Sequence, residues 1–510
     1  MSEFTEFPIK RKRASEVGDA LRAAIDAPRK ERYNVLDYGA IGDGTTDSTT
    51  AINEAIQAAH EAGGGEVFFP PGDYLISRSA ASAVDPYWSE YTAEGGAGSL
   101  PALLLLQGVD LIGSGASNTK ITLSTSDPAA HVKCFEATDF RVSGIHFFGN
   151  RVNMDFISGE VECLDFKKGC ARFTVSHCKF EAIQNEAIDL DVRAEDVARL
   201  EEDGVHNIIH DCVFEFVGGT GIHNALWTVV ERCVFRNVGM ARLAGSIAGL
   251  PGTSGQGAID GSGIALRVRD CYAEDCARLL HIYSNPVGAG SRQVSKTVVE
   301  NCYVVNSAAG DVEGTSSSFA LIRDSVFAGP APSVANSFMD GVELIADGSI
   351  TDLPNLPVNG GMVNCVIVGR GITIGSQAAG MIVSGCLIDC SSRTTSVSVI
   401  SLIGNGLNDV VIHSCRLIQN ATATAPILGT NTDVEQRRNR ITNNRISGSC
   451  NHYIRVGSDS VVSGNICSGG GMNGITVKNN RNIITGNVMD RPVVEISGAT
   501  DNVIADNIVT

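Results

Sequence analysis

The feature of this chain that most constrains its fold is a short motif that recurs from residue 142 to the C-terminus. Each copy has a branched or long aliphatic residue, two further residues and then usually Cys or Asn, as in VSHC at Val175 and ITGN at Ile484. The fourth position holds Cys178, Cys212, Cys233, Cys271, Cys302, Cys365, Cys386 and Cys415, and then Asn444, Asn465, Asn487 and Asn507. Several steps between copies are 20 to 23 residues long. A period of this size, with β-forming residues and tolerated insertions, predicts an all-β solenoid in which each repeat is one turn of a parallel β-helix.

Like positions of successive turns would stack at about 4.8 Å, the spacing of paired strands. The Cys residues then form an apolar ladder inside the solenoid, and the Asn residues form a hydrogen-bonded one. This explains most of the 15 Cys as reduced core residues. Because paired metal-ligand spacings such as CxxC are essentially missing, the sequence predicts neither a metal site nor a cofactor.

The composition excludes several classes of partner. A net charge of −18 leaves no broad basic surface for nucleic acid, and the basic run at residues 10–13 is expected to be a solvated arm. No apolar run approaches the ~18 residues of a membrane span. The N-terminus, MSEFTEFPIKRKR, has no apolar signal segment. We therefore expect a virion-associated protein, an extracellular one exported by a non-classical route, or a cytoplasmic one.

The organisation that we predict is an N-terminal arm or helix over residues 1–33 and a β-helix over residues 34–510. Long loops usually carry function. They are expected where the repeat is interrupted, near 191–206, 242–263, 284–295 and 328–360.

The segment NVLDYGAIGDGTTDSTTAI at 34–52 predicts a cap for the first turn of the solenoid, which would otherwise be an open edge. Thr46 or Asp47 is a suitable N-cap for an amphipathic helix, and the glycines at 63–65 end it. A strand over residues 66–69 and a turn over residues 70–73 follow.

This segment resembles the N-terminal signature of the pectate-lyase-like right-handed β-helix superfamily. The matching residues are Asn34-Val35, Asp37-Tyr38-Gly39-Ala40, Gly42-Asp43-Gly44, Thr46-Asp47, Thr49, Ala51-Ile52, Gly63-Gly64-Gly65 and Pro70-Pro71-Gly72-Asp73-Tyr74. The superfamily includes polygalacturonases, pectate and alginate lyases, alginate C5-epimerases and phage tailspike depolymerases. The resemblance implies right-handed coiling and a glycan substrate, whereas the reaction is not implied because one fold hosts many.

Counting from the Cys ladder predicts a column of side chains on one outer face. The residues eleven positions after Cys178, Cys212, Cys233 and Cys302, and ten after Cys271, are Asp189, His223, Ala244, Glu313 and His281. Four of these five side chains are ionisable, so the column is a candidate catalytic site, although a solvated face would have the same pattern.

Asp189 and Asp191 share one face of a strand at a spacing of about 6.5 to 7 Å. This spacing is at the lower limit for inverting glycosidases, and neighbouring acids push their pKa values apart so that one can act as general acid. Glu186 is expected to assist. Arg193, Arg267 and Arg278 are candidates for binding substrate, and Tyr283 and Trp227 for stacking on sugar rings.

A second reaction is compatible with the same strand. The stretch EAIDLD at 186–191 falls where alginate C5-epimerases have an aromatic-Gly-aromatic-Asp-Pro-His motif. Asp189 matches its Asp, whereas Asp191 replaces its His and Glu186 its first aromatic residue, Tyr. His223, or His281 with Tyr283, would then supply the acid and base for a proton next to a carboxylate.

The sequence therefore predicts a polysaccharide-degrading enzyme, a glycoside hydrolase of tailspike type in the first place. The alternatives are a uronate lyase or C5-epimerase, and a tail or adhesin protein that only binds glycan. Because the repeats continue to Val509-Thr510, we expect either a homotrimer that covers the last turn or a monomer with a frayed one.

Overall fold

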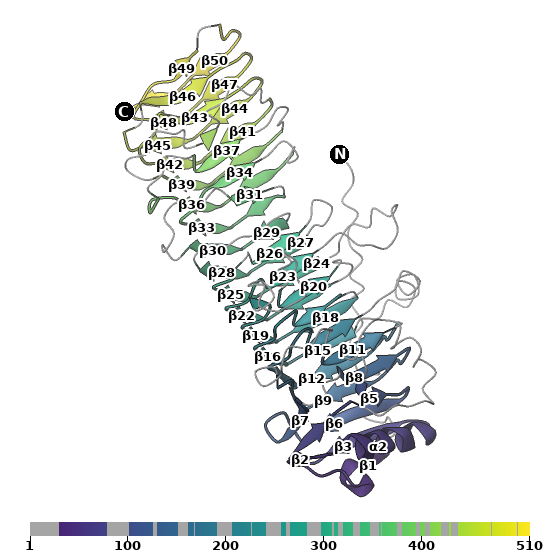
Figure 1. Cartoon of the computed structure of the whole chain (residues 1–510). Helices are drawn as coiled ribbons and strands as arrows, with labels where there is room; N and C mark the ends of the chain where they lie inside the picture. The colour runs from purple at the N-terminus through teal and green to yellow at the C-terminus, as the bar shows by residue number, and fades with distance from the viewer. Residues whose placement is uncertain are drawn as a thin grey trace.

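The computed structural model describes residues 30–78, 101–125, 130–150, 162–167, 169–190, 207–225, 227–240, 257–261, 266–282, 297–308, 311–314, 320–329, 337–346, 356–358, 360–374, 380–393, 398–402, 409–419, 428–429, 437–470, 472–496 and 498–510. They form an elongated right-handed parallel β-helix that runs from a helical cap at the N-terminal end to bare strands at the C-terminal end (Figure 1). Most coils contribute one strand to each of three sheets, and all strand pairs given below are parallel. The predicted fold class is confirmed.

The first sheet has 18 strands. They are β1 (Arg32–Asn34), β3 (Gly65–Phe69), β6 (Val109–Gly113), β9 (Arg141–Ser143), β12 (Thr174–Ser176), β15 (Asn207–His210), β18 (Thr228–Glu231), β21 (Arg267–Arg269), β24 (Thr297–Glu300), β27 (Ala320–Arg323), β29 (Ser337–Asp340), β32 (Met362–Val363), β35 (Ile382–Ser384), β38 (Val411–His413), β41 (Arg440–Thr442), β44 (Val461–Ser463), β47 (Ile483–Thr485) and β50 (Val503–Ala505).

The second sheet also has 18 strands. They are β2 (Asp43–Asp47), β4 (Gly72–Ile76), β7 (Thr119–Leu123), β10 (His146–Phe148), β13 (Lys179–Glu181), β16 (Val213–Glu215), β19 (Val234–Arg236), β22 (Tyr272–Glu274), β25 (Tyr303–Val305), β28 (Val326–Gly329), β30 (Glu343–Ala346), β33 (Val366–Val368), β36 (Leu387–Asp389), β39 (Arg416–Ile418), β42 (Arg445–Ser447), β45 (Ile466–Ser468), β48 (Val488–Met489) and β51 (Ile508–Val509).

The third sheet is divided into an eight-stranded part and a seven-stranded part. The eight-stranded part comprises β5 (Pro101–Leu105), β8 (Ala130–Phe135), β11 (Leu164–Lys167), β14 (Ile188–Leu190), β17 (Ile222–His223), β20 (Ile259–Gly261), β23 (Leu280–Ile282) and β26 (Val312–Gly314). The seven-stranded part comprises β31 (Leu356–Val358), β34 (Ile372–Ile374), β37 (Ile400–Leu402), β40 (Leu428–Gly429), β43 (His452–Val456), β46 (Asn473–Val477) and β49 (Val494–Glu495).

The cap consists of a 3-10 helix, η1 (Val35–Tyr38), and the helix α2 (Thr49–Glu61). The apolar face of α2, including Ile52, Ala55, Ile56 and Ala59, is buried against η1 and the strands β1, β3 and β5. This apolar face covers the first coil, as the sequence predicts.

The predicted N-cap of α2 is wrong by one residue. Ser48 occupies that position, while Asp47 Oδ1 accepts a hydrogen bond from the Thr49 backbone N–H at 2.9 Å. The Asp47 side chain therefore still satisfies one of the free donors at the start of the helix.

The interior is built from like residues stacked in register. In the second sheet the rings of Phe147, Phe180, Phe214 and Phe235 are stacked, with centroids 5.5, 4.9 and 4.7 Å apart. All 15 Cys residues are buried free thiols, and those of the ladder donate to carbonyl oxygens, as Cys212 Sγ does to Val175 O at 3.7 Å. The prediction that the Cys residues are reduced core residues is confirmed.

The Asn ladder is a chain of hydrogen bonds between three buried side chains and the half-buried Asn507. Asn444 Nδ2 donates to Asn465 Oδ1 at 3.0 Å, Asn465 Nδ2 to Asn487 Oδ1 at 2.9 Å, and Asn487 Nδ2 to Asn507 Oδ1 at 2.8 Å. The exchange of Cys for Asn thus changes the chemistry of the ladder but not its position.

Three predicted boundaries differ from the structure. The predicted loop over 328–360 contains β29, β30 and β31. The sequence pattern did not reveal this coil because its ladder position holds the buried Val342 instead of the Cys that marks other coils. The predicted loop over 242–263 contains β20, and the arm predicted to end at residue 33 contributes β1 to the first sheet. The predicted loops near 191–206 and 284–295 and most of the arm lie outside the described residues.

The part of the chain that the structure describes holds no helix with the length and hydrophobicity needed to cross a membrane.

Candidate functional site

Seven residues lie at one register position across the eight-stranded part of the third sheet. From the N-terminal side they are Lys133, Asp165, Asp189, His223, Asp260, His281 and Glu313. We call them the charged column. In the strands whose side chains are described, the neighbours of these residues are buried apolar side chains, such as Ile188 and Leu190 around Asp189. The alternation of a strand therefore turns the column outward.

The predicted column is confirmed at Asp189, His223, His281 and Glu313 by the strand register, although the side chain of Glu313 lies outside the described part of the chain. It is wrong at Ala244, whose position in the column is taken by Asp260. The offset from the Cys ladder fails in this coil because the chain makes a long insertion between Cys233 and β20.

An alternating series of charges links the first five residues of the column. Lys133 Nζ lies 2.6 Å from one oxygen of Asp165, and Lys167 Nζ lies 3.1 Å from the other. Lys167, which follows Asp165 by two positions on β11, also lies 2.9 Å from Asp189 Oδ2. The other oxygen of Asp189 is 2.9 Å from His223 Nδ1.

His223 connects two carboxylates. Its Nε2 lies 3.7 Å from Asp260 Oδ1, which also accepts a hydrogen bond from the Asn224 backbone N–H at 3.1 Å. Thr220 Oγ1 donates to the other oxygen of Asp260 at 3.2 Å. Asp260 is therefore fixed by its own hydrogen bonds and, with Asp189, holds the imidazole from both sides.

The members of this series differ in exposure. The side chains of Asp189 and Asp260 are 9% and 3% exposed, whereas the His223 side chain retains 30% of its surface. A molecule bound at this face would accordingly contact the imidazole rather than the carboxylates beneath it.

The electrostatics of the site favour a charged imidazole. Burial alone would lower the pKa of His223, but the charges of Asp260, Asp189 and Glu186 outweigh burial and raise it well above its usual value of 6.5. For Asp189, burial would raise the pKa, but His223 and Lys167 bring it below its usual range. At neutral pH the site thus holds an imidazolium against an Asp189 carboxylate.

Other acids near the column behave differently. Burial raises the pKa of Asp260, although His223 opposes the shift. Burial, assisted by the charges of Asp165 and Glu186, raises the pKa of Glu162 well above its usual range. The site therefore contains carboxyl groups with pKa values shifted in opposite directions, a pattern that often marks acid and base residues.

The remaining predicted residues are dispersed. Glu186 is buried two residues before β14 and acts on the column through its charge. Arg278 is buried two residues before β23, near the column. Arg267 lies exposed on β21 of the first sheet, which is a different face of the solenoid from the column, and its role in binding substrate stays a prediction. Trp227 directly precedes β18 and is buried, and burial does not suit a ring that stacks on a sugar.

Asp191, Arg193 and Tyr283 lie outside the described residues, and their roles stay predictions.

The sequence reasoning missed Lys133, Asp165, Lys167 and Asp260. Counting from the ladder fails for Asp165 as it does for Asp260, because an insertion separates each from the preceding ladder position. One signal was available for Asp260, since the tripeptide Ala-Ile-Asp at 187–189 occurs again at 258–260.

Comparison with known proteins assigns the first part of the column to a recognised kind of domain. Residues 32–248 match a family described as rhamnogalacturonase A/epimerase, pectate lyase-like. The matched range includes the column from Lys133 to His223. It confirms the resemblance to pectate-lyase-like proteins that the opening residues indicate.

Two curated relatives and one solved structure illustrate the likeness. Mannuronan C5-epimerase AlgE1 of Azotobacter vinelandii is 34% identical over 128 residues, which are 24% of this chain and 8% of the relative. Alginate lyase 7 of the same organism is 42% identical over 91 residues, 18% of this chain and 9% of the relative. The tailspike protein of E. coli bacteriophage HK620, solved with a pentasaccharide, covers 94% of this chain and 79% of its own at 14% identity and a TM-score of 0.48. The matched segment thus spans less than a tenth of each curated relative.

Proposed function

We propose that this chain, whose residues 32–248 carry a pectate lyase-like domain, acts on a uronic-acid polysaccharide by proton transfer at C5 of the sugar, as an epimerase or a lyase. The observation that carries the proposal is the partly exposed, positively charged His223 between Asp189 and Asp260. The similarity of a 128-residue segment to a mannuronan C5-epimerase and of a 91-residue segment to an alginate lyase supports the same substrate class.

Both reactions begin when a base removes the C5 proton, which places negative charge on the neighbouring carboxylate of the substrate. A cationic donor at that point stabilises the charge as it develops. The Nδ1–H of His223 is directed at Asp189, whereas Nε2 is 3.7 Å from Asp260, longer than a hydrogen bond. The Nε2–H can therefore donate to a substrate without first breaking a hydrogen bond to Asp260.

The second half of the reaction decides between the two products. A proton delivered to the opposite face of C5 completes epimerisation, whereas breaking the bond between C4 and the glycosidic oxygen, with a proton to that oxygen, completes elimination. His223 is the acid in this scheme, and Asp189 and Asp260 are positioning residues. His281 and Tyr283 remain the sequence candidates for the base.

One observation favours glycoside hydrolysis as a second candidate. Asp189 and Asp260 stand on alternate strands, about 9 to 10 Å apart at their Cα atoms by the strand spacing. Their pKa values are shifted in opposite directions, lowered for Asp189 and raised for Asp260. An inverting hydrolase needs one ionised and one protonated carboxyl group at about 6.5 to 9.5 Å. Their burial beneath His223 is the reason that we place this reaction second.

The test is an assay of polymannuronate, alginate, polygalacturonate and a panel of neutral glycans in deuterated water. Deuterium at C5, seen by NMR, reports epimerisation. The ultraviolet absorbance of unsaturated uronides reports elimination, and new reducing ends without that absorbance report hydrolysis.

Two variants assign the residues. His223→Gln keeps a hydrogen-bonding side chain without the charge, and we expect it to lower turnover by about a hundredfold or more. His413→Gln is the matched control, because His413 ends β38 on the first sheet, away from the column, and should leave turnover unchanged.

Three results would count against the proposal. New reducing ends without deuterium at C5 would show that glycoside hydrolysis, the second candidate reaction, is the activity of this site. No detectable product from any glycan would favour a protein that binds glycan without converting it. A fully active His223→Gln enzyme would remove His223 from the mechanism.

A further inference from the structure

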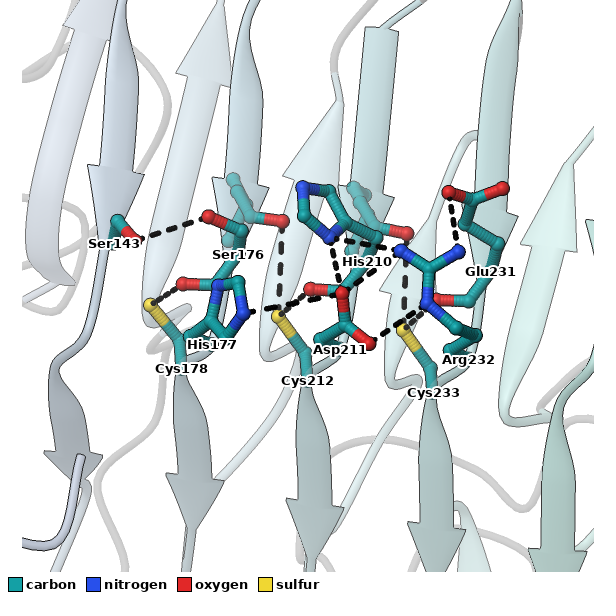
Figure 2. A network of polar contacts seen from close by, with 12 residues as sticks. Ser143, Ser176, His177, Cys178, His210, Asp211, Cys212, Glu231, Arg232 and Cys233 are labelled. Carbon is teal, nitrogen blue, oxygen red and sulfur yellow. Dashed lines mark hydrogen bonds and ion pairs between the residues drawn. The ribbon is translucent and has the colours of Figure 1, made fainter. Parts of the chain in front are cut away.

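A second group of polar side chains lies on the outside of the first sheet, far from the charged column. His177 follows β12, His210 ends β15 and Asp211 follows it, so the group joins two neighbouring coils (Figure 2). His177 and Asp211 have left-handed backbone conformations, with φ of 53° and 54°. His177 directly precedes the ladder residue Cys178, and Asp211 directly precedes Cys212. The two turns therefore occupy equivalent positions in neighbouring coils and lie one on the other. The His177 backbone N–H donates to the His210 carbonyl at 3.2 Å, which fixes the turns relative to each other.

The donor atoms of the three side chains converge. His210 Nδ1 is 2.5 Å and His177 Nε2 is 4.0 Å from Asp211 Oδ2, and one ligand atom from each residue can be chosen so that all lie within 4.8 Å. Ligands of a tetrahedral ion with bonds of 2.0–2.1 Å lie about 3.3 Å from one another. The donor separations bracket this value. Shifts of about 1.5 Å or less in these separations, mostly through movement of the exposed His177 ring, would therefore complete the geometry.

We propose that His177, His210 and Asp211 form a binding site for a divalent transition-metal ion of the zinc class. Two imidazoles and one carboxylate are the ligands that such ions prefer, whereas calcium and magnesium prefer oxygen alone. Three protein ligands leave a fourth position for water. The sequence did not predict this site because its two histidines are separated by 33 positions and meet only through the coil repeat.

Arg232, from the next coil, determines the strength of the site. Its Nε donates to Asp211 Oδ1 at 2.8 Å and its Nη2 to Asp211 Oδ2 at 2.9 Å, while Nη1 donates to Glu231 at 2.8 Å. Figure 2 shows the guanidinium beside Asp211 on the side away from His177. An ion bound to Oδ2 takes the place of Nη2, whereas the contacts of Nε and Nη1 can persist.

The same residue therefore has two opposing effects. It orients the carboxylate, as hydrogen-bonding partners of metal ligands generally do. It also places a positive charge next to the ion, which lowers the affinity. We expect an affinity in the micromolar range, weaker than that of a four-ligand structural site.

The test is titration of the purified full chain with zinc chloride by calorimetry, followed by the absorption spectrum of the cobalt form. We expect one equivalent to bind. Nitrogen and oxygen ligands give cobalt bands in the visible range without the intense near-ultraviolet thiolate band that the buried Cys residues would produce.

The variants separate this site from other histidines. His177→Ala, at an exposed side chain, should weaken binding at least tenfold without loss of the fold. Arg232→Gln removes the positive charge beside the ion and should strengthen binding by about tenfold. His413→Ala is the matched control, because His413 occupies the position of His210 in another coil and bonds to Thr442 instead. It should bind zinc as the unaltered chain does.

The proposal is overturned if zinc does not bind, or if it binds equally well to His177→Ala. A thiolate band in the cobalt spectrum would also overturn it, because it would place the ion at a Cys residue.

Discussion

The Asn ladder leads to a prediction that can be worked out atom by atom. Asn465 is fully buried and makes four hydrogen bonds through its side chain. Its Nδ2 donates to the Ile441 carbonyl and to Asn487 Oδ1, both at 2.9 Å. Its Oδ1 accepts from the backbone N–H and from Nδ2 of Asn444, both at 3.0 Å. Asn465→Ala removes all four.

The magnitude follows from what each partner retains. Asn487 Oδ1 keeps the Asn465 backbone N–H at 3.0 Å, and Asn444 Nδ2 keeps the Ile412 carbonyl at 3.0 Å. The Asn444 backbone N–H loses its acceptor in a buried position, which costs about 1–3 kcal/mol. With the other lost bonds, we expect local stability to fall by about 3 kcal/mol.

The assay is amide hydrogen exchange, because a solenoid can open in segments and a single unfolding midpoint would then average over them. At about 1.4 kcal/mol per factor of ten, the Asn444 amide should exchange about a hundredfold faster in Asn465→Ala. Asn465→Cys, which restores the ladder residue of the earlier coils but provides no equivalent acceptor, should lie in between.

Asn507→Ala provides the control for position. Asn507 is only half-buried in the last coil, where water can replace its hydrogen bonds. Asn507→Ala should therefore lower local stability less than Asn465→Ala does. If exchange at Asn444 is unchanged in Asn465→Ala, the side-chain ladder does not hold these turns and the reasoning is refuted.

Three further predictions concern charged groups. Asp165→Asn leaves the buried Lys133 without its carboxylate, which should lower stability by about 3–5 kcal/mol, seen as a lower thermal midpoint; an unchanged midpoint would contradict it. The pKa of His223 in the folded protein is raised above 6.5, so the stability that its charged form contributes is complete below pH 6.5 and is lost as the pH rises through the folded-state pKa. His223→Gln should therefore flatten the alkaline part of a plot of thermal midpoint against pH. Arg438→Ala breaks an exposed pair with Asp409, so the midpoint of chemical denaturation should stay nearly unchanged; a clear fall in that midpoint would mean that the pair is more than a surface contact.

The charged column shows how far counting along the sequence can go. Asp189 and His223 each follow a ladder Cys by eleven residues, and the strand register pairs them as that count predicts. Asp260 follows Cys233 by twenty-seven residues, and the same count selects Ala244 instead. An insertion changes the number of residues between two strands without changing where the second strand pairs. The count is therefore reliable only in coils without insertions.

The role of each charged residue could not be predicted from the sequence, because it depends on contacts between coils. Lys167 lies between Asp165 and Asp189, and His223 lies between Asp189 and Asp260, only because residues 22 to 37 positions apart become neighbours. The same stacking separates Arg267 from the site, since its strand belongs to another sheet. The order of strands around one coil thus decides which charges meet.

The solenoid, its cap and its ladders follow from the amino-acid sequence alone, because a repeat of β-formers with one buried Cys or Asn per turn has a single way to bury that residue in every coil. Which outward residues form a site depends on how the coils stack. Outward positions have no burial requirement that would reveal them in the sequence. The function of an outward residue depends on which side chains lie near it. At the spacing of paired strands, an imidazole can bridge two carboxylates, and two histidines from successive turns can face one Asp.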